Sequence, residues 1–168
     1  GRARFGMSKG HGTPALYPVL AMRGCFPEKQ LGLFRSIEGH MSGHPGMVNV
    51  PGVDMSTGSL GQGLSAAVGM ALAGKLDGAD YRVYALMGDG EIEEGQIWEA
   101  AMSAAKYKLD GLCGIVDVNG LQIDGRTADV MPSEPLDKKF EAFGWKVIKA
   151  DGHDFDSLRA ALAEARAE

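Results

Sequence analysis

The chain has 168 residues, a length that suits one domain with a single hydrophobic core and is short for two. Hydrophobic residues make up 45% and charged residues 23%, and no apolar run approaches the roughly 20 residues that span a bilayer, so no membrane segment is expected. The formal net charge of -5 argues against a nucleic-acid-binding surface, which needs clustered Lys and Arg.

Cysteine and glycine usage narrows the class of protein further. Cys25 and Cys113 lie far apart without metal-ligand spacing, so we expect reduced thiols in a cytoplasmic protein. The 25 glycines punctuate apolar segments instead of forming a linker, and glycine used in this way lets backbone approach a neighbour closely. The first residues show no signal-peptide pattern, and the sequence stops within a helical pattern. We expect a single domain over residues 1–168 that is incomplete at both ends.

The first third of the chain predicts two short helices and a long loop. A helix is expected from Thr13, as a cap, to Gly24, with Pro14 in its first position. Pro27 begins a second helix that runs through Arg35. The segment from Gly39 to Val53 is rich in glycine and proline and predicts a loop, and loops of this length are often functional.

The middle of the chain alternates between helix and strand. A helix is predicted where apolar residues recur at helical spacing between Leu60 and Leu72. Short apolar runs predict strands over Tyr81–Met87 and Leu112–Val118, with a helix over Glu94–Leu109 between them. Such a unit is a right-handed crossover, so its two strands run parallel and their carboxyl ends lie at one edge.

The last third continues the same alternation. A helix is predicted over Leu136–Phe143, a strand over Trp145–Ile148, and a final helix from an Asp154 cap. The fold class is therefore α/β, a mostly parallel sheet with helices on both faces.

Polar residues follow the two central strands at the edge where ligands of parallel sheets bind. Asp89 lies between Gly88 and Gly90 after the first strand, and Asn119 follows the second. Their oxygens suit Mg²⁺ or Ca²⁺, and the glycines let the turn approach a diphosphate at the start of a helix. The cation is also needed because nearby glutamates would repel a diphosphate. Alone, Gly-Asp-Gly is more often a plain strand-to-helix turn, but Asn119 at the next strand end favours a ligand site.

Longer motifs make the pattern specific. The run GDGEIEEGQIWEAAMSAAKYKLDGLCGIVDVNGLQIDG, from Gly88 to Gly125, resembles the thiamine diphosphate signature in the form that transketolases have. Further segments fit the same family in its order, namely SKGHG from Ser8, SGHPG from Ser42, STGSLGQG from Ser56 and EAFGWKVIKADGHD from Glu141. The resemblance covers nearly the whole chain and is strongest to the N-terminal subunit of split bacterial transketolases. It implies the thiamine diphosphate-binding fold of the family's first domain.

The resemblance implies roles for individual residues. Asp89, Asn119 and the backbone carbonyl of Leu121 would bind the metal, and the Gly90 amide would bind the diphosphate. His11 would lie at the cofactor phosphate and the substrate, and His44 at the reacting end of the sugar. The remaining implied positions are Gly58, Leu60 and Ile123 along the cofactor and Glu94 at a dimer interface between two active sites. His40 and His153 match no such motif and are expected to be structural or surface residues.

The resemblance also implies a reaction and partners. A transketolase moves a two-carbon ketol unit from a ketose phosphate to an aldose phosphate, as in the pentose phosphate pathway. In the family, a glutamate from a separate pyrimidine-binding domain activates the cofactor, and no segment here resembles that domain. We therefore expect a C-terminal subunit or domain as partner, in a homodimer or a heterotetramer, and no activity from this chain alone.

Three alternatives remain open. Another thiamine diphosphate enzyme, such as a deoxyxylulose-phosphate synthase or a dehydrogenase E1 component, would share the metal site but not the sugar chemistry. A nicotinamide-dependent oxidoreductase is disfavoured because GDGEIE lacks the third glycine of G-x-G-x-x-G. A noncatalytic assembly module would give the motif glycines and His11 no cofactor to bind.

Overall fold

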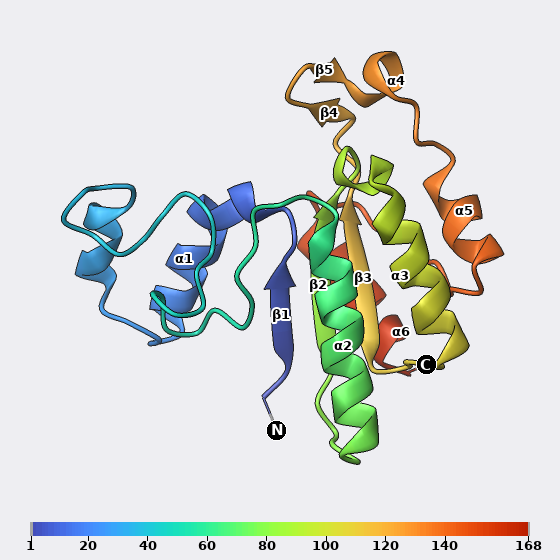
Figure 1. Cartoon of the computed structure of the whole chain (residues 1–168), viewed down its shortest axis with the longest axis horizontal. Coiled ribbons are helices and arrows are strands. Elements are labelled where there is room, and N and C mark those ends of the chain that lie inside the picture. Colours follow the sequence, from blue (N-terminus) through green and yellow to red (C-terminus); the bar gives the residue numbers. More distant parts are fainter. Residues whose placement is uncertain (1, 168) are drawn as a thin grey trace.

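A parallel sheet forms the centre of the molecule. The computed structural model describes residues 2–167. Its main sheet has the order β1-β2-β3, built from β1 (Arg4–Met7), β2 (Val83–Gly88) and β3 (Leu112–Asp117), and both pairings are parallel. The three strands therefore end at one common edge (Figure 1). The predicted crossover of β2 and β3 is confirmed, whereas the short strand β1 was not predicted.

Alternation along β2 explains why both faces of the sheet are covered. Val83, Ala85 and Met87 are buried in the main core, which lies between the sheet and two helices, α2 (Gln62–Leu76) and α3 (Gly95–Lys106). The intervening Tyr84 faces the other way, where its hydroxyl accepts a hydrogen bond from Arg166 of α6 (Phe155–Ala167). Figure 1 shows α2 in front of the sheet and α6 behind it. The predicted α/β class with helices on both faces is confirmed.

A second, smaller core holds the first third of the chain together. It joins the helix α1 (Thr13–Met22) to the long loop through Tyr17, Met41 and Val50, all buried. The turn η1 (Gly10–Gly12) precedes α1, and η2 (Glu28–Leu33) follows it. The predicted second helix thus exists only as a shorter 3-10 helix. The loop from Gly39 to Val53 contains no helix or strand, as predicted.

The segment after β3 forms a small projection. A two-residue turn joins β4 (Leu121–Gln122) to β5 (Gly125–Arg126), and α4 (Thr127–Val130) follows directly. These elements stand beyond the carboxyl edge of the sheet in Figure 1. The chain then returns along the outside of α3 through α5 (Leu136–Ala142), where Phe140 packs against Trp98. The helix near Leu136 was predicted, but the hairpin was not.

Two local predictions are wrong. Gly12, not Thr13, is the N-cap of α1; Thr13 is the first residue of the helix, and its hydroxyl donates to the carbonyl oxygen of Gly43 (2.8 Å). The segment Trp145–Ile148 is not a strand: within residues 2–167 no neighbouring strand pairs with it. Its apolar side chains still cover the core, and the Trp145 indole donates to Ala101 (3.0 Å). Apolar alternation alone did not distinguish an unpaired extended segment from a paired strand.

The final helix has the predicted N-cap. Asp154 Oδ1 accepts from the backbone of Asp156 (3.0 Å) at the start of α6. No helix in the described part of the chain is long and apolar enough to cross a membrane.

The main core predicts a contrast within a single helix. Leu64 and Leu76 both belong to α2, but Leu64 is fully buried while Leu76 is 78% exposed. Leu64→Ala leaves a cavity and should lower the free energy of unfolding by about 2–5 kcal/mol. Leu76→Ala is the matched control and should change it by less than about 0.5 kcal/mol. Urea unfolding measures both, and equal losses would contradict the assigned burial.

Candidate functional site

The turns that follow β2 and β3 meet at the carboxyl edge of the sheet. Asp89 is buried, and its Oδ2 accepts from the Gly120 amide (2.7 Å) while its Oδ1 accepts from the Gly90 amide (3.0 Å). The exposed Asn119 precedes Gly120, and its Oδ1 accepts from the Leu121 amide (2.9 Å). The structure therefore brings the three predicted metal-binding residues to one edge.

The donor chemistry of this edge fits a hard cation that also binds a ligand. No cluster of three or more His, Cys, Asp or Glu side chains suited to a metal occurs among residues 2–167. The predicted set has one carboxylate, one amide oxygen and one carbonyl. Such a set leaves coordination positions for phosphate oxygens and water, as is usual for Mg²⁺.

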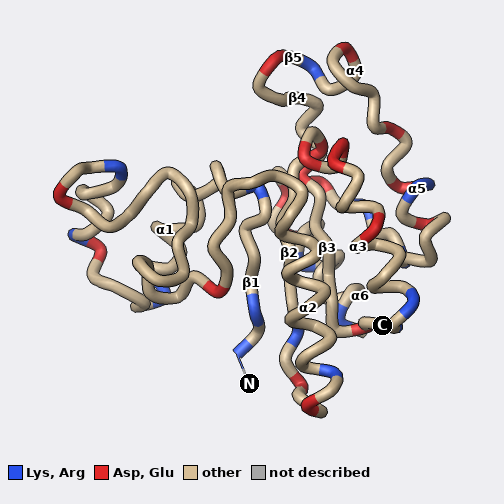
Figure 2. The backbone as a smooth tube through the Cα atoms, in the orientation of Figure 1, with Lys and Arg blue, Asp and Glu red and all other residues tan. Residues whose placement is uncertain are grey.

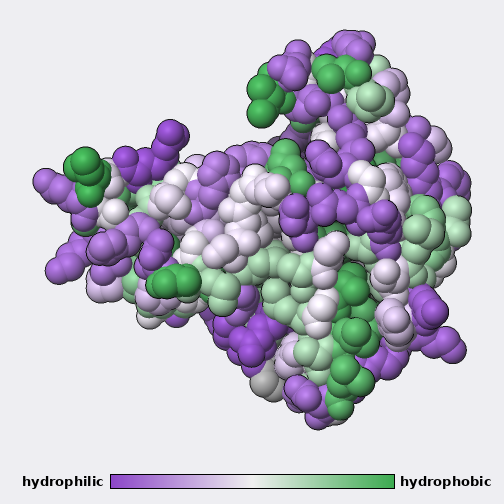
Figure 3. All heavy atoms as spheres, viewed as in Figure 1, coloured by the Kyte–Doolittle hydropathy of each residue, from purple (hydrophilic) through white to green (hydrophobic). Residues whose placement is uncertain are grey.

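The β4–β5 hairpin packs against the Gly-Asp-Gly turn. A Cβ placed on Gly90 would lie 2.9 Å from Cβ of Gln122, so a side chain at this position would push the hairpin away. Gln122 also donates through Nε2 to Glu93 (2.6 Å). Ile123 lies in the hairpin turn and is 98% exposed, and Leu121 is 62% exposed. Figure 3 shows separate apolar side chains among hydrophilic ones on this projection.

Three glycine-rich segments converge at Gly58. A Cβ on Gly58, whose φ is +150°, would lie 3.2 Å from the His44 ring, and a Cβ on Gly10 would lie 2.8 Å from the Gly58 amide nitrogen. The segments that carry His11, His44 and Gly58 are therefore in direct contact. Both histidine side chains are exposed, so both are accessible to a ligand.

Hydrogen bonds hold the His44 segment on the rest of the fold. The Tyr17 hydroxyl donates to the His44 carbonyl oxygen (3.1 Å), and burial raises the pKa of this tyrosine. The Thr57 amide donates to Pro45 (3.2 Å), and the Thr57 hydroxyl donates to Met7 at the end of β1 (2.6 Å). The long loop is thus fixed to both α1 and the sheet, which gives His44 a defined place.

A salt bridge joins the two parts of this edge. Lys9 follows β1, and its Nζ lies 2.6 Å from Oδ2 of Asp117, the last residue of β3. The same Asp117 oxygen accepts from Nδ2 of Asn119 (3.3 Å). The hydrogen bond from Lys9 holds the pKa of Asp117 below its ordinary value, although partial burial acts in the opposite direction. The sequence did not single out either partner, although Lys9 belongs to the SKGHG motif.

Acidic groups dominate the start of the helix that follows β2. Asp89, Glu91, Glu93 and Glu94 are close in sequence, and Figure 2 shows their segments together above β2 and β3. Glu94 is exposed, forms the N-cap of α3 and lies beside Gly61, where a Cβ would be 2.6 Å from Cβ of Glu94. An anionic ligand at this edge therefore needs a bound cation. Leu60, half-buried, precedes Gly61.

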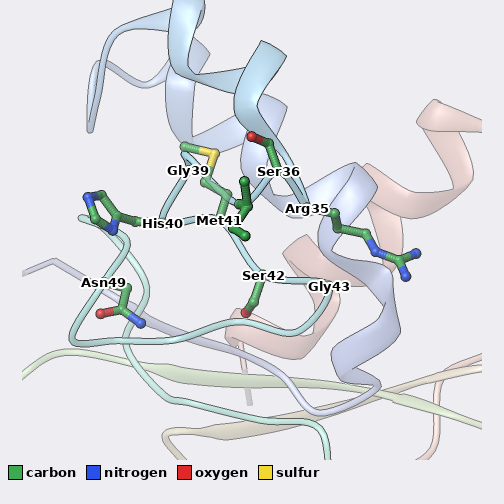
Figure 4. A pocket seen from close by; sticks show the side chains of 9 residues that line it. Arg35, Ser36, Gly39, His40, Met41, Ser42, Gly43 and Asn49 are labelled. Atoms are coloured by element: carbon green, nitrogen blue, oxygen red, sulfur yellow. The ribbon is translucent and has the colours of Figure 1, made fainter.

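A hollow of about 540 Å³ lies elsewhere, in the long loop. It is lined by parts of the segment from Arg35 to Gly43 and by Asn49. In Figure 4 the His40 and Asn49 side chains lie on one side of it while the Arg35 side chain extends away on the other. Its polar groups do not converge, so we place the candidate site at the carboxyl edge of the sheet, which is also where the predicted residues lie.

Comparison with known proteins shows which family this chain resembles. Residues 1–168 match the family described as "Transketolase, thiamine diphosphate binding domain". The 6-deoxy-6-sulfo-D-fructose transketolase subunit SqwG of Clostridium sp. strain MSTE9 is 48% identical over 165 residues, which are 98% of this chain and 60% of that protein. An apulose-4-phosphate transketolase subunit of Phocaeicola vulgatus is 49% identical over 160 residues, 94% of this chain and 56% of that protein. The chain spans less than two thirds of either relative.

Solved structures show the same fold in longer proteins. The transketolase of Campylobacter jejuni superposes with a TM-score of 0.92 at 34% identity, covering 99% of this chain and 27% of that protein. The transketolase from Leishmania mexicana gives a TM-score of 0.90 at 37% identity, with 99% of this chain and 27% of that protein covered.

The Lys9–Asp117 salt bridge predicts a measurable pKa. Lys9→Met removes the hydrogen bond and should raise the Asp117 pKa toward the ordinary value of about 3.9, as followed by carboxyl NMR during a pH titration. Because the folded-state pKa is depressed, the pair stabilises the fold above the unfolded-state pKa, and this stability is lost as the pH falls through the folded-state pKa.

Lys138→Met is the matched control, since Lys138 pairs with Glu141 on the surface of α5. It should leave the Asp117 titration unchanged. An Asp117 pKa that is the same with and without Lys9 would contradict the assigned contact.

Proposed function

The chain belongs to the transketolase family, and from this membership we propose that its carboxyl edge holds thiamine diphosphate through a divalent metal and supports ketol transfer. The observation that carries the proposal is the meeting of Asp89 with the Asn119–Leu121 turn, joined by the 2.7 Å hydrogen bond from Gly120 to Asp89. This is the edge at which parallel sheets bind ligands.

The proposed metal ligands are oxygens, as Mg²⁺ or Ca²⁺ requires. Asp89 and Asn119 would each give a side-chain oxygen, Leu121 its backbone carbonyl, and the diphosphate the remaining oxygens. The Gly90 amide, which donates to Asp89 Oδ1 in this structure, would donate to the same diphosphate in its place, while Gly88 keeps the turn free of side-chain bulk. The acidic residues nearby support this arrangement, because only a cation between them and the diphosphate removes the repulsion.

The segments around Gly58 would hold the rest of the cofactor and the sugar. Gly58 and Leu60 would line the cofactor, and the exposed rings of His11 and His44 would donate hydrogen bonds or move protons at the sugar hydroxyls and carbonyl oxygen. When bound, thiamine diphosphate supplies the nucleophilic carbon that carries the two-carbon unit. This chain's own part is to bind, to orient and to keep the reacting sugar in place.

The proposal includes a second polypeptide region. The Clostridium and Phocaeicola relatives are both named as transketolase subunits, a term for parts of enzymes that consist of more than one chain. Glu94 is exposed here, which fits a contact with a partner domain that supplies the activating glutamate. Ile123, also exposed, would lie along the cofactor. We propose a half-site that is completed in a homodimer or a heterotetramer, with sugar phosphates as substrates.

Binding of thiamine diphosphate tests the proposal directly. Calorimetric titration of the full-length protein should give binding that depends on Mg²⁺. Asp89→Asn and Asn119→Ala should each weaken it by about tenfold or more, since each removes a proposed oxygen ligand of the metal. Thermal unfolding of each variant checks that the fold persists.

Asp110→Asn is the matched control for Asp89→Asn, because Asp110 lies before β3 at the opposite edge of the sheet. It should bind like wild type. Absent binding, or binding that neither variant at the carboxyl edge alters, would leave a noncatalytic assembly module as the better explanation.

A further inference from the structure

A second buried carboxylate, Glu91, lies behind the candidate metal site. It is 2% exposed, and Asp89 is the other acidic residue buried among residues 2–167. Burying a charged carboxylate is costly unless hydrogen bonds replace the lost water. Glutamate is almost never fully buried unless it is paired, so the buried Glu91 indicates a specific role.

Three donors from three different segments satisfy the Glu91 carboxylate. Oε1 accepts from the Ser8 hydroxyl and from the Gly61 amide (2.9 Å), and Oε2 accepts from the Gly88 amide (3.2 Å). Ser8 follows β1, Gly61 precedes α2 and Gly88 ends β2. All three donors are neutral, and Glu91 forms no ion pair with a described residue, so these hydrogen bonds are what replaces its lost water.

Each donor belongs to a segment with a proposed ligand-binding residue. Ser8 is three residues before His11, Gly61 follows Leu60, and Gly88 precedes Asp89. The Glu91 carboxylate thus joins the turn proposed to hold the metal and the diphosphate to the two segments that carry His11 and Gly58. Sequence proximity alone does not join them, since Ser8 and Gly61 are 83 and 30 residues from Glu91.

We infer that Glu91 is a positioning residue that fixes these three segments relative to one another before the cofactor binds. The inference rests on the proposed function and adds to it a residue that touches neither metal nor diphosphate. Its contribution is preorganisation: segments already in place lose less conformational freedom on binding, so affinity is higher. Glu91 should therefore govern how tightly the cofactor is held more than how fast the bound cofactor reacts.

Glu91→Gln changes this arrangement with little change in shape. A glutamine amide has one oxygen and one NH₂ group. The NH₂ group would replace either Oε1 or Oε2 of Glu91, and its N–H would then face a backbone N–H or the Ser8 O–H. Leaving a buried donor unpaired costs enough to loosen the segment that carries it. If the NH₂ group takes the place of Oε2, the Gly88 turn loses its acceptor; if it takes the place of Oε1, the Ser8 and Gly61 segments lose theirs. All of these segments carry proposed cofactor contacts.

The test measures calorimetric binding of thiamine diphosphate to the full-length protein, and activation of that protein by the cofactor when it is assembled with the region that completes the site, both at saturating Mg²⁺. Glu91→Gln should raise the half-saturating cofactor concentration by about tenfold, while kcat at saturating cofactor stays within about threefold of wild type. A purely structural role would lower the amount of folded protein, and so the maximal rate, without moving half-saturation.

Asp54→Asn is the matched control. The Asp54 carboxylate is also shielded from solvent, its side chain 6% exposed, and it accepts from the Phe5 amide (2.9 Å) and from Arg2. It acts on β1 away from the carboxyl edge and should leave half-saturation unchanged, even if the melting temperature falls. Should Glu91→Gln fail to fold, Ser8→Ala removes a single donor and should raise half-saturation by about threefold.

The outcomes separate the inference from the proposed function. A raised half-saturation in Glu91→Gln or Ser8→Ala with Asp54→Asn unchanged supports the inference. Wild-type protein that responds to the cofactor, with half-saturation unchanged in both Glu91→Gln and Ser8→Ala, overturns the inference alone. Wild-type protein that neither binds nor responds to thiamine diphosphate overturns the proposed function and the inference with it.

Discussion

Parallel pairing of β1, β2 and β3 is the constraint on which the rest of the molecule depends. The register sets Gly88 opposite Asp117. The turn that begins with Asp89 and the turn that contains Asn119 therefore start from adjacent points of the sheet. The same pairing sets Met7 opposite Leu86, which brings Ser8 and Lys9 to that edge as well. If any one of the three strands ran in the opposite direction, the residues that follow it would lie at the other edge of the sheet, whatever their side-chain chemistry.

Charge explains why this edge needs more than hydrogen bonds. The segment from Asp89 to Glu94 is strongly acidic, and Asp117 adds another carboxylate. Lys9 forms a salt bridge with Asp117. The fold stabilises the buried carboxylates through neutral donors, in particular the backbone amides of Gly61, Gly88, Gly90 and Gly120. A metal between these carboxylates and a diphosphate would remove their repulsion, which is why the proposed site includes a cation beside the diphosphate.

Sequence reasoning predicted the parts of the fold whose pattern is local. The apolar run of β2, the stripe of α3 and the Gly-Asp-Gly and Asn signals at the strand ends each lie within one short segment. The central crossover was therefore predicted, as was the placement of Asp89 and Asn119 at one edge. Arg4–Met7 is too short to show a strand period, and its pairing depends on β2, 76 or more residues later. Trp145–Ile148 has the apolar content of a strand but no partner strand among the residues that the structure describes. Glu91 could not be found, because its three donors are adjacent only after folding.

Manganese in place of magnesium gives the most direct measurement of the central claim. Crystals of the full-length protein grown with thiamine diphosphate and Mn²⁺ would locate the ion by anomalous diffraction. We expect one peak beside the diphosphate, within coordination distance of Asp89, Asn119 and the Leu121 carbonyl oxygen. An ion bound elsewhere, or thiamine diphosphate bound with no ion between it and Asp89, would contradict the proposed site.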